Sequence, residues 1–393
     1  MIIRADEIAA RIKSLQKALS EARTDGALLV ERTDIYYFSG TDQNAHLYVP
    51  AEGEAVLMVR KSLDRARKDS PLSNIFPLAG FSQLPALIKE KSGRMPARMG
   101  LEFDILPVMF YRNYEKNFPG ADLMDVSQIL RRIRMVKSDY EISCIAMASE
   151  LADLMLNEVP KFIHESRTEN DLAARVEYFY RLHGHSGIIP TRTFPYPSLY
   201  GQIMSGPRAA EPSSSSGPLG GRGLGPFFSA SASMSDIGPG EPIIVDYAAT
   251  YEGYISDQTR IFSIGPLGDK FLRAQDAVRR IQDRLAAEAR PGMLTGELYA
   301  LALKIVDEAG FSATFMGHPE PAPFVGHGVG LELDDWPVIA KGGREPLREG
   351  MVIALEPKIV FPGEGVAGIE NTFVVTETGL KKLNRYPDEI TYC

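Results

Sequence analysis

Residues 241–262 read EPIIVDYAATYEGYISDQTRIF, and this stretch decides the fold. Two runs rich in β-branched and aromatic residues flank residues 251–254, which have the composition of a turn, so a β-hairpin is predicted. If the hairpin folds between Tyr251 and Glu252, Asp246 lies directly opposite Asp257. Two carboxylates that face each other on antiparallel strands repel, and a cation between them would reverse the sign of that interaction.

A second stretch, residues 352–375, repeats the arrangement in VIALEPKIVFPGEGVAGIENTFVV. If this hairpin folds about Gly363, Glu356 faces Glu370. Both carboxylates emerge from strongly apolar strands, where an unpaired buried carboxylate is costly or becomes protonated. The alternative is that these acids lie on the solvent faces of two unrelated hairpins. One pair alone leaves that alternative open, but two such pairs together make it a poor explanation.

A histidine completes the set. His327 lies in FVGHGVGLE, residues 324–332, where the flanking glycines let a ligand or another backbone come close. Four carboxylates and a neutral imidazole carry four negative charges, which two divalent cations would balance. Oxygen-rich ligation with one nitrogen suits Mn, Co, Fe or Zn. Such a pair lowers the pKa of a bridging water and polarises a substrate carbonyl, so the pattern predicts a dinuclear metal site.

Composition excludes several other classes of protein. The chain has 393 residues and a formal net charge of -8, and 44% of its residues are hydrophobic. A large core can be buried, and general binding of nucleic acid or of an anionic membrane is disfavoured. The 2 cysteines cannot build a disulfide framework or a cysteine-based zinc site. With no signal-peptide start and no apolar run long enough for a membrane span, we expect a cytoplasmic protein.

A change of texture divides the chain into two predicted domains, residues 1–132 and residues 133–393. Strands that alternate with helices, residues 35–38 among the strands, predict a small α/β domain in the first part. In the second part, Thr168 and Asp171 have the spacing of a capping box and predict a helix start. Residues 195–240 are rich in Pro, Gly and Ser but also hold aromatic residues, which favours an ordered loop over a disordered linker.

The motifs resemble those of the pita-bread metallopeptidases, the superfamily of aminopeptidase P, prolidase, methionine aminopeptidase and creatinase. The likeness is carried by the two acidic pairs and by SDQTR at 256–260, GHGVGL at 326–331 and GIENT at 368–372. The first part of the chain is similar to the N-terminal domain of the creatinase, prolidase and aminopeptidase P branch. The resemblance implies an α+β chain, in which a creatinase-type α/β domain precedes a pita-bread catalytic domain that holds the dinuclear site.

The resemblance also implies roles for these residues. Asp246 would chelate one metal ion, Asp257 and Glu370 would bridge the two ions, and His327 and Glu356 would bind the second ion. Glu370 would in addition act as the general base on the bridging water. Because all five positions are filled, the chain resembles the metal-dependent members of the superfamily rather than creatinase. Members of this branch are commonly homodimers, so we expect a homodimer.

The chain departs from the peptidase pattern at the histidines that hold the scissile carbonyl. Asp334 stands at one of these positions and Ser213 at another, and residues 321–323 lack the third histidine. A carboxylate cannot donate a hydrogen bond to an oxyanion unless it is protonated, so this change alters the catalytic electrostatics. Asp334 is therefore a candidate catalytic group of a different kind, although a solvated loop position explains it equally well.

Three further residues are candidates for substrate binding. Arg222 could bind a substrate carboxylate, and Trp336 and Tyr200 could bind a cationic group through their aromatic faces. Packing or surface positions are the alternative explanation for each of them.

Three functions follow. The first is a metal-dependent hydrolase of an amide or C–N bond, with Xaa-Pro peptides as the default substrate. The second is a lyase or hydrolase that acts on a small zwitterion, with Asp334 as its base, because the dimethylsulfoniopropionate lyase branch of this superfamily also lacks the peptidase histidines. The third is a non-catalytic binding module, which the retention of all five expected ligands disfavours.

Overall fold

A computed structural model describes residues 3–192, 199–214 and 217–393. It divides the chain after Arg134 into two compact units, an N-terminal unit of residues 1–134 and a C-terminal unit of residues 135–393. Among the described residues, no helix is both long and apolar enough to cross a membrane.

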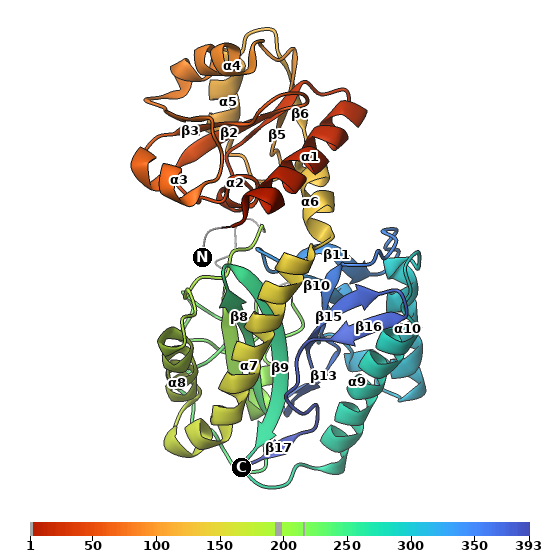
Figure 1. Ribbon diagram of the computed structural model, residues 1–393. Helices are drawn as coiled ribbons and strands as arrows, with labels where there is room; N and C mark the ends of the chain where they lie inside the picture. The colour runs from red at the N-terminus through yellow and green to blue at the C-terminus, as the bar shows by residue number, and fades with distance from the viewer. Residues whose placement is uncertain (1–2, 193–198, 215–216) are drawn as a thin grey trace. The chain divides into compact units, whose positions relative to one another are not determined.

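The N-terminal unit is a six-stranded mixed sheet with helices packed around it (Figure 1). Its strands lie in the order β4-β3-β2-β1-β5-β6. The strands are β1 (Gly26–Leu29), β2 (Ala45–Pro50), β3 (Val56–Val59), β4 (Ile75–Pro77), β5 (Arg98–Leu101) and β6 (Asp122–Asp125). The helices are α1 (Ala5–Glu21), α2 (Arg32–Ser39), α3 (Leu63–Asp69), α4 (Leu84–Ser92), α5 (Val108–Asn117) and α6 (Ser127–Met135), the last of which ends at the first residue of the C-terminal unit.

The strand predicted at residues 35–38 is wrong, because these residues lie within helix α2. The Glu31 carboxylate accepts a hydrogen bond from the Asp34 backbone N–H and caps the start of the helix. Gly40, with φ 78°, ends it in the left-handed conformation. A short apolar run is compatible with a strand or a helix, so hydrophobicity alone does not decide between them. Here the caps at both ends favour the helix.

The C-terminal unit is built from two main sheets and a small third one. A four-stranded sheet has the order β17-β9-β8-β7, a five-stranded sheet has the order β11-β10-β12-β15-β16, and β13 pairs with β14. The strands are β7 (Gly201–Ser205), β8 (Ile243–Tyr251), β9 (Tyr254–Ser263), β10 (Phe324–Gly328), β11 (Asp335–Ala340), β12 (Val352–Leu355), β13 (Lys358–Phe361), β14 (Gly365–Gly368), β15 (Asn371–Thr376), β16 (Gly379–Lys382) and β17 (Thr391–Tyr392).

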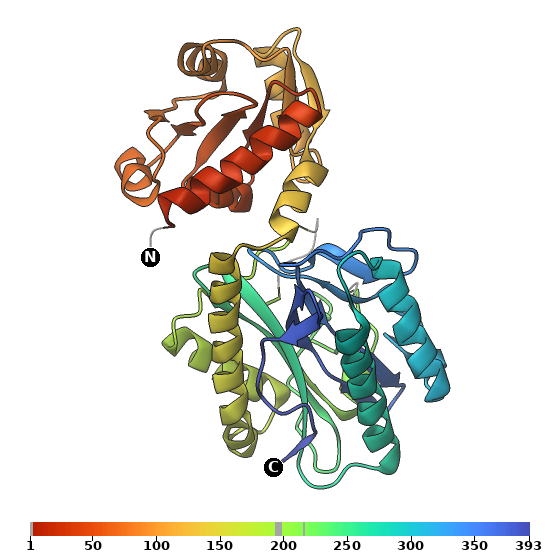
Figure 2. The same ribbon diagram turned by 45° about the vertical axis from the view of Figure 1, so that its right-hand side comes forward.

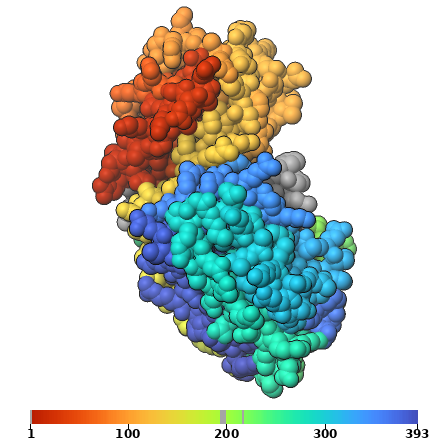
Figure 3. Space-filling model, turned by 90° about the vertical axis from the view of Figure 1, so that its right-hand side faces the viewer, coloured from red at the N-terminus to blue at the C-terminus, as the bar shows by residue number. Residues whose placement is uncertain are grey.

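Helices cover both sheets of this unit. Helices α7 (Asp139–Glu165) and α8 (Glu169–Leu182) pack on the sheet of β7, β8 and β9, and α9 (Asp269–Glu288) packs on β14 and β16 (Figure 2). Helix α9 and helix α10 (Thr295–Glu308), teal to cyan in Figure 3, form the face of the unit seen there. The main core lies beneath them, where Val278, Ile281 and Ile353 are fully buried.

Two local predictions fall in this unit. The capping box before α8 is confirmed, because the Thr168 hydroxyl accepts from the Asp171 N–H at 3.1 Å and the Asp171 carboxylate accepts from the Thr168 N–H at 3.1 Å. The loop predicted at residues 195–240 instead holds β7 and a 3₁₀ turn (Gly206–Ala210) in its described part. Residues 195–198 and 215–216 of that stretch lie outside the described residues.

Candidate metal centre

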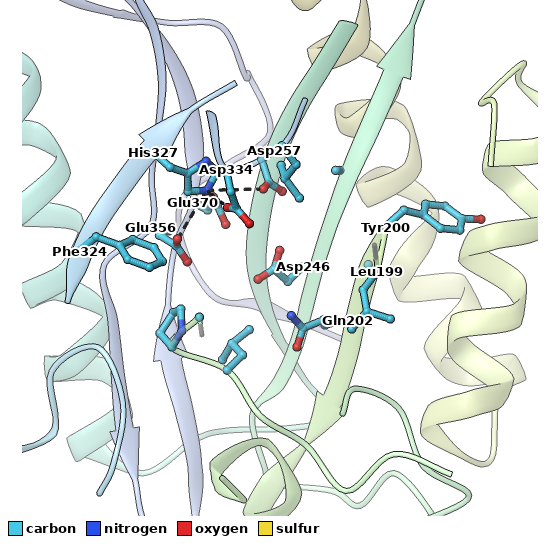
Figure 4. Close-up of a pocket in the computed structure, with 16 residues that line it drawn as sticks. Leu199, Tyr200, Gln202, Asp246, Asp257, Phe324, His327, Asp334, Glu356 and Glu370 are labelled. Carbon is cyan, nitrogen blue, oxygen red and sulfur yellow. Dashed lines mark ion pairs between the residues drawn. The ribbon is translucent and has the colours of Figure 1, made fainter. Parts of the chain in front are cut away.

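The predicted ligand residues line one pocket of the C-terminal unit (Figure 4). Strands β8 and β9 supply Asp246 and Asp257, β10 supplies His327, and the segments beside β12 and β15 supply Glu356 and Glu370. The other residues that line the pocket are Leu199, Tyr200, Gly201, Gln202, Gly217, Pro218, Leu219, Ala248, Phe324, Leu333 and Asp334.

The first acidic pair is brought together by a register that differs from the predicted one. Asp246 pairs with Thr259, and Asp257 pairs with Ala248, so the two carboxylates are not directly opposite each other. The tight turn consists of Glu252 and Gly253, with φ 51° and 83°, which lies one residue later than expected. Because side chains alternate between faces, an offset of two residues keeps both aspartates on the face that lines the pocket.

The second acidic pair follows the predicted fold about Gly363. Lys358 pairs with Gly368 on one side of Glu356 and Glu370, and Leu355 pairs with Asn371 on the other side. The two glutamates lie where the ladder is interrupted, next to Pro357, which has no N–H to donate. Glu370 instead pairs with Thr259 of β9, whose hydroxyl donates to Glu370 Oε2 at 2.9 Å.

His327 lies at the centre of a set of carboxylate oxygens. Its Nε2 is 3.5 Å from Glu356 Oε1, 3.5 Å from Glu370 Oε1, 3.6 Å from Asp334 Oδ1 and 3.9 Å from Asp257 Oδ2. Ligand atoms about 2.1 Å from a tetrahedral ion lie about 3.4 Å from one another, so these spacings suit a divalent ion. One ligand atom from each of Asp257, His327 and Glu370 lies within 4.8 Å of the other two.

Glu370 supplies an independent indication of a missing partner. Its side chain is 2% exposed, and its buried Oε1 has only the 3.5 Å ion pair with His327 Nε2 and accepts no hydrogen bond. A buried carboxylate oxygen without a donor is costly. A cation on the His327 side would remove that cost, so the residues present fit one divalent ion at this position.

Sequence reasoning missed Lys358. Its Nζ, with a side chain 1% exposed, lies 2.7 Å from Glu356 Oε2, 3.2 Å from Glu370 Oε2 and 3.3 Å from Asp246 Oδ2. Gly368 lies opposite Lys358 in the register, and a Cβ there would come within 2.6 Å of the lysine Cγ, so the glycine leaves room for the stem. The available signal was a lone cation in the apolar run VIALEPKIV, one residue after the Glu356-Pro357 break.

The electrostatics of the site follow from burial and from Lys358. Burial raises the pKa of Asp246 to about 6 and the pKa of Glu356 to about 7. Burial would also raise the pKa of Glu370, but the Lys358 ammonium, His327 and the Thr259 hydroxyl together outweigh it, and the pKa falls to about 2. For His327, burial opposes the charged form, yet the surrounding carboxylates, Asp334 first, raise its pKa well above the usual value. Glu370 is therefore the carboxylate held most firmly in its charged form.

Arg260 holds this part of the site together. Its guanidinium is 0% exposed and donates to the backbone oxygens of Glu370, Tyr386 and Pro387 at 2.6–2.8 Å. It also donates to Asp388 Oδ1 at 2.9 Å. The backbone of Glu370 is thus tied to the last ten residues of the chain.

The predicted substrate residues are placed unequally. Tyr200 lines the pocket, and its ring stacks on His185 with centroids 4.8 Å apart. Arg222 and Trp336 are not among the pocket-lining residues: Arg222 pairs with Glu211 on the surface at 2.5 Å, and Trp336 packs against the main core. Among the described residues, His327 is the only histidine that lines the pocket.

Comparison with protein families gives two matches that together span most of the chain. The model of metallopeptidase family M24 matches residues 143–377. The model of the creatinase/prolidase N-terminal domain matches residues 11–136.

Individual proteins are similar over the full length. An Xaa-Pro dipeptidase of Pyrococcus furiosus is 29% identical over 382 residues, which cover 97% of this chain and 99% of the relative. The structure of an Xaa-Pro dipeptidase from Bacillus anthracis has a TM-score of 0.83 at 25% identity, with 98% and 100% of the two chains covered. A prolidase structure from Pyrococcus horikoshii has a TM-score of 0.81 at 26% identity, with 97% and 99% covered.

Proposed function

This chain belongs to metallopeptidase family M24, a family of metal-dependent hydrolases, and from that premise we propose that it cleaves short Xaa-Pro peptides before the proline. The observation that carries the proposal is the cluster of Asp257, His327 and Glu370, which has the ligand types and spacing for a divalent ion. The similar proteins named as Xaa-Pro dipeptidases and prolidases support the choice of substrate.

The candidate ions are Mn, Co, Fe and Zn, in keeping with oxygen-rich ligation and one nitrogen. When bound, such an ion supplies a Lewis acid for the scissile carbonyl and lowers the pKa of water. Asp257, His327 and Glu370, whose ligand atoms lie within 4.8 Å of one another, would hold it, together with Glu356, whose Oε1 is 3.5 Å from His327 Nε2. The sequence-based expectation of a second ion, with Asp246 as its ligand, stays a prediction.

Glu370 is the proposed general base. Its Oε1 accepts no hydrogen bond, and its pKa of about 2 keeps the carboxylate charged at neutral pH. Glu370 accepts a proton from water as the oxygen adds to the carbonyl carbon, and it passes that proton to the proline nitrogen as the C–N bond breaks. The hydroxyl ends on the acyl product and the proton on the proline product, so the hydrolysis balances.

The proposed substrate pocket is lined by apolar side chains as well as by acidic ones. Phe324, Leu333 and Pro218 line it beside the carboxylates. We assign the proline ring to this apolar surface, where it packs without leaving a polar group unpaired. The imide bond of proline has no N–H, so the leaving nitrogen needs no hydrogen-bond acceptor from the protein.

The test is an activity screen with defined metals. Purified protein is stripped with a chelator, reloaded separately with Mn, Co, Fe or Zn, and given Ala-Pro and Leu-Pro beside Ala-Ala and Leu-Ala. We expect hydrolysis of the two Xaa-Pro dipeptides but not of Ala-Ala or Leu-Ala, and only after metal has been reloaded. Turnover of betaine or sulfonium zwitterions without turnover of any peptide would overturn the proposal in favour of the zwitterion function. Full activity after chelation would overturn its metal dependence.

A further inference from the structure

Lys358 and His327 face the same two carboxylates from opposite sides. Glu356 and Glu370 each have Oε2 toward Lys358 Nζ and Oε1 toward His327 Nε2. A carboxylate that bridges two metal ions divides its oxygens in the same way. We propose that the Lys358 ammonium takes the place of one metal ion, so that each chain binds a single divalent ion, on the His327 side.

The two aspartates divide in the same manner. Asp246 Oδ2 faces Lys358 at 3.3 Å, and Asp257 Oδ2 faces His327 at 3.9 Å. The acidic groups thus form two neighbouring cation positions with Glu356 and Glu370 between them. One position already holds a covalently attached cation, and the other contains the Glu370 oxygen that lacks a donor.

A second ion on the Lys358 side would have to compete with the ammonium for the carboxylate oxygens that face it. The ammonium donates to Glu356 Oε2 at 2.7 Å and to Glu370 Oε2 at 3.2 Å, and it forms an ion pair with Asp246 Oδ2 at 3.3 Å. Glu370 Oε2 also accepts from the Thr259 hydroxyl at 2.9 Å. An ion bound to Asp246 Oδ2 would need these oxygens at about 2.1 Å. It would then lie beside a buried positive charge that repels it.

Lys358 is built into its position. It lies on β13, its side chain is 1% exposed, and its stem passes over Gly368, where any Cβ would collide with it. A lysine that swung out to admit an ion would leave a buried strand position in a tightly packed unit. The ammonium is therefore a permanent member of the site.

The inference rests on the proposed function for its premise that a divalent ion binds, and its test counts ions rather than turnover. Stripped protein is dialysed against excess Mn²⁺, freed of unbound metal, and analysed for Mn per chain by mass spectrometry of the element. Electron paramagnetic resonance of the same sample shows whether the Mn²⁺ is isolated or coupled to a second ion about 3.5–4 Å away.

Three variants accompany the wild-type protein. Lys358→Gly removes the cation and opens its position, whereas Lys358→Met removes the charge but keeps the volume. Lys381→Gly is the matched control, because Lys381 is an exposed strand residue of the same unit, paired with Val374. Circular dichroism of each variant checks that it is folded.

We expect one isolated Mn²⁺ per chain for the wild type, Lys358→Met and Lys381→Gly, and two coupled ions for Lys358→Gly. Two coupled ions on the wild type would overturn the inference and leave the proposed function standing, whether or not the glycine variant folds. A folded Lys358→Gly that still binds one ion would also overturn it. No ion on the wild type would overturn the metal dependence of the proposed function as well, so the two failures are distinguishable.

Discussion

At the scale of single residues, Glu370 has both a structural and a proposed catalytic role. Its Oε2 is bound by Thr259 and Lys358, while its Oε1 is left for other chemistry. We expect Glu370→Gln to lower kcat by about 10²- to 10⁴-fold, because the amide cannot accept the proton. The measurement is steady-state hydrolysis of Ala-Pro at saturating metal, with metal content determined in parallel. Glu364→Gln, on the exposed tip of the same hairpin, should leave kcat unchanged; equal losses in both variants would argue against a special role for Glu370.

Asp334 is the residue whose role is most open. Its side chain is 49% exposed, yet its Oδ1 lies 3.6 Å from His327 Nε2, so it contacts the expected metal position. Its φ of 56° is a conformation that asparagine also adopts readily, so Asp334→Asn removes the charge and keeps the backbone.

We expect Asp334→Asn to weaken metal binding by about 10- to 100-fold, as loss of a supporting carboxylate does at other metal sites. Titration of stripped protein with metal, followed by recovery of activity, measures the affinity. Asp276→Asn on the exposed face of α9 is the control. Unchanged affinity and unchanged activity would remove Asp334 from both the metal site and the catalytic machinery.

Residue-level reasoning from the sequence selected the acidic groups that line the pocket but not the cation among them. Asp246, Asp257, Glu356 and Glu370 stand out because charge in an apolar strand is unusual. Lys358 is also a charged residue in an apolar strand. Whether its ammonium enters the site depends on the interruption of the strand at Pro357, and the sequence spacing does not predict that interruption. The roles of Arg222 and Trp336 in substrate binding stay predictions without a place in the pocket.

At the scale of elements, the start of α8 offers a clean test. The Thr168 hydroxyl and the Asp171 carboxylate satisfy two backbone N–H groups that the helix leaves unpaired. Thr168→Ala should lower the free energy of unfolding by about 1 kcal/mol, whereas Thr168→Ser should keep most of it. Denaturant unfolding followed by tryptophan fluorescence is suitable, because Trp336, the only tryptophan, lies in the same unit. A serine variant as unstable as the alanine variant would show that the methyl packing, not the cap, matters.

The two hairpins show what pattern reasoning can and cannot supply. The fold about Gly363 is correct because Pro-Gly-Glu-Gly leaves few turn positions to choose from. The fold about residues 251–252 is wrong by one residue, because Glu252 adopts the positive φ that a two-residue turn needs and that glutamate disfavours. The prediction that the two aspartates lie close together is still correct, because both side chains are on the same face of the sheet.

At the scale of the whole molecule, the N-terminal unit contains a buried histidine that titrates apart from the metal site. Burial, assisted by the Arg60 charge, lowers the pKa of His46 to about 4. The unfolded chain takes up a proton near the ordinary histidine pKa of about 6.5, whereas the folded unit stays neutral. The free energy of unfolding is therefore unaffected by the titration of His46 above about pH 6.5. As the pH falls from about 6.5 toward 4, protonation of His46 in the unfolded chain lowers that free energy by about 3 kcal/mol in total.

We expect peptides over β2 and β3 to lose protection from hydrogen exchange between pH 7 and pH 5 in the wild type. His46→Gln should reduce that loss, because glutamine takes up no proton and can still bond the Tyr114 hydroxyl, which now lies 2.8 Å from His46 Nε2. Comparing wild type and variant at each pH cancels the intrinsic pH dependence of exchange. His164→Gln, an exposed histidine, serves as the control. Identical pH dependence in wild type and His46→Gln would contradict the prediction.

The fold class follows from the sequence because the ordered metal-ligand motifs are specific to it. The α+β architecture, with a creatinase-type N-terminal domain and a pita-bread C-terminal domain, is confirmed by the family matches and the solved relatives. The homodimer stays a prediction, since subunit contacts depend on surface shape and not on these motifs.

The ties of Arg260 have a practical consequence for handling the protein. Residues 386–388 are bonded to the same guanidinium that holds the Glu370 backbone. A proteolytic cut next to residues 386–388 during storage would release these partners and act on the metal position through this guanidinium. Loss of activity in ageing preparations should first be checked by measuring the intact mass of the protein.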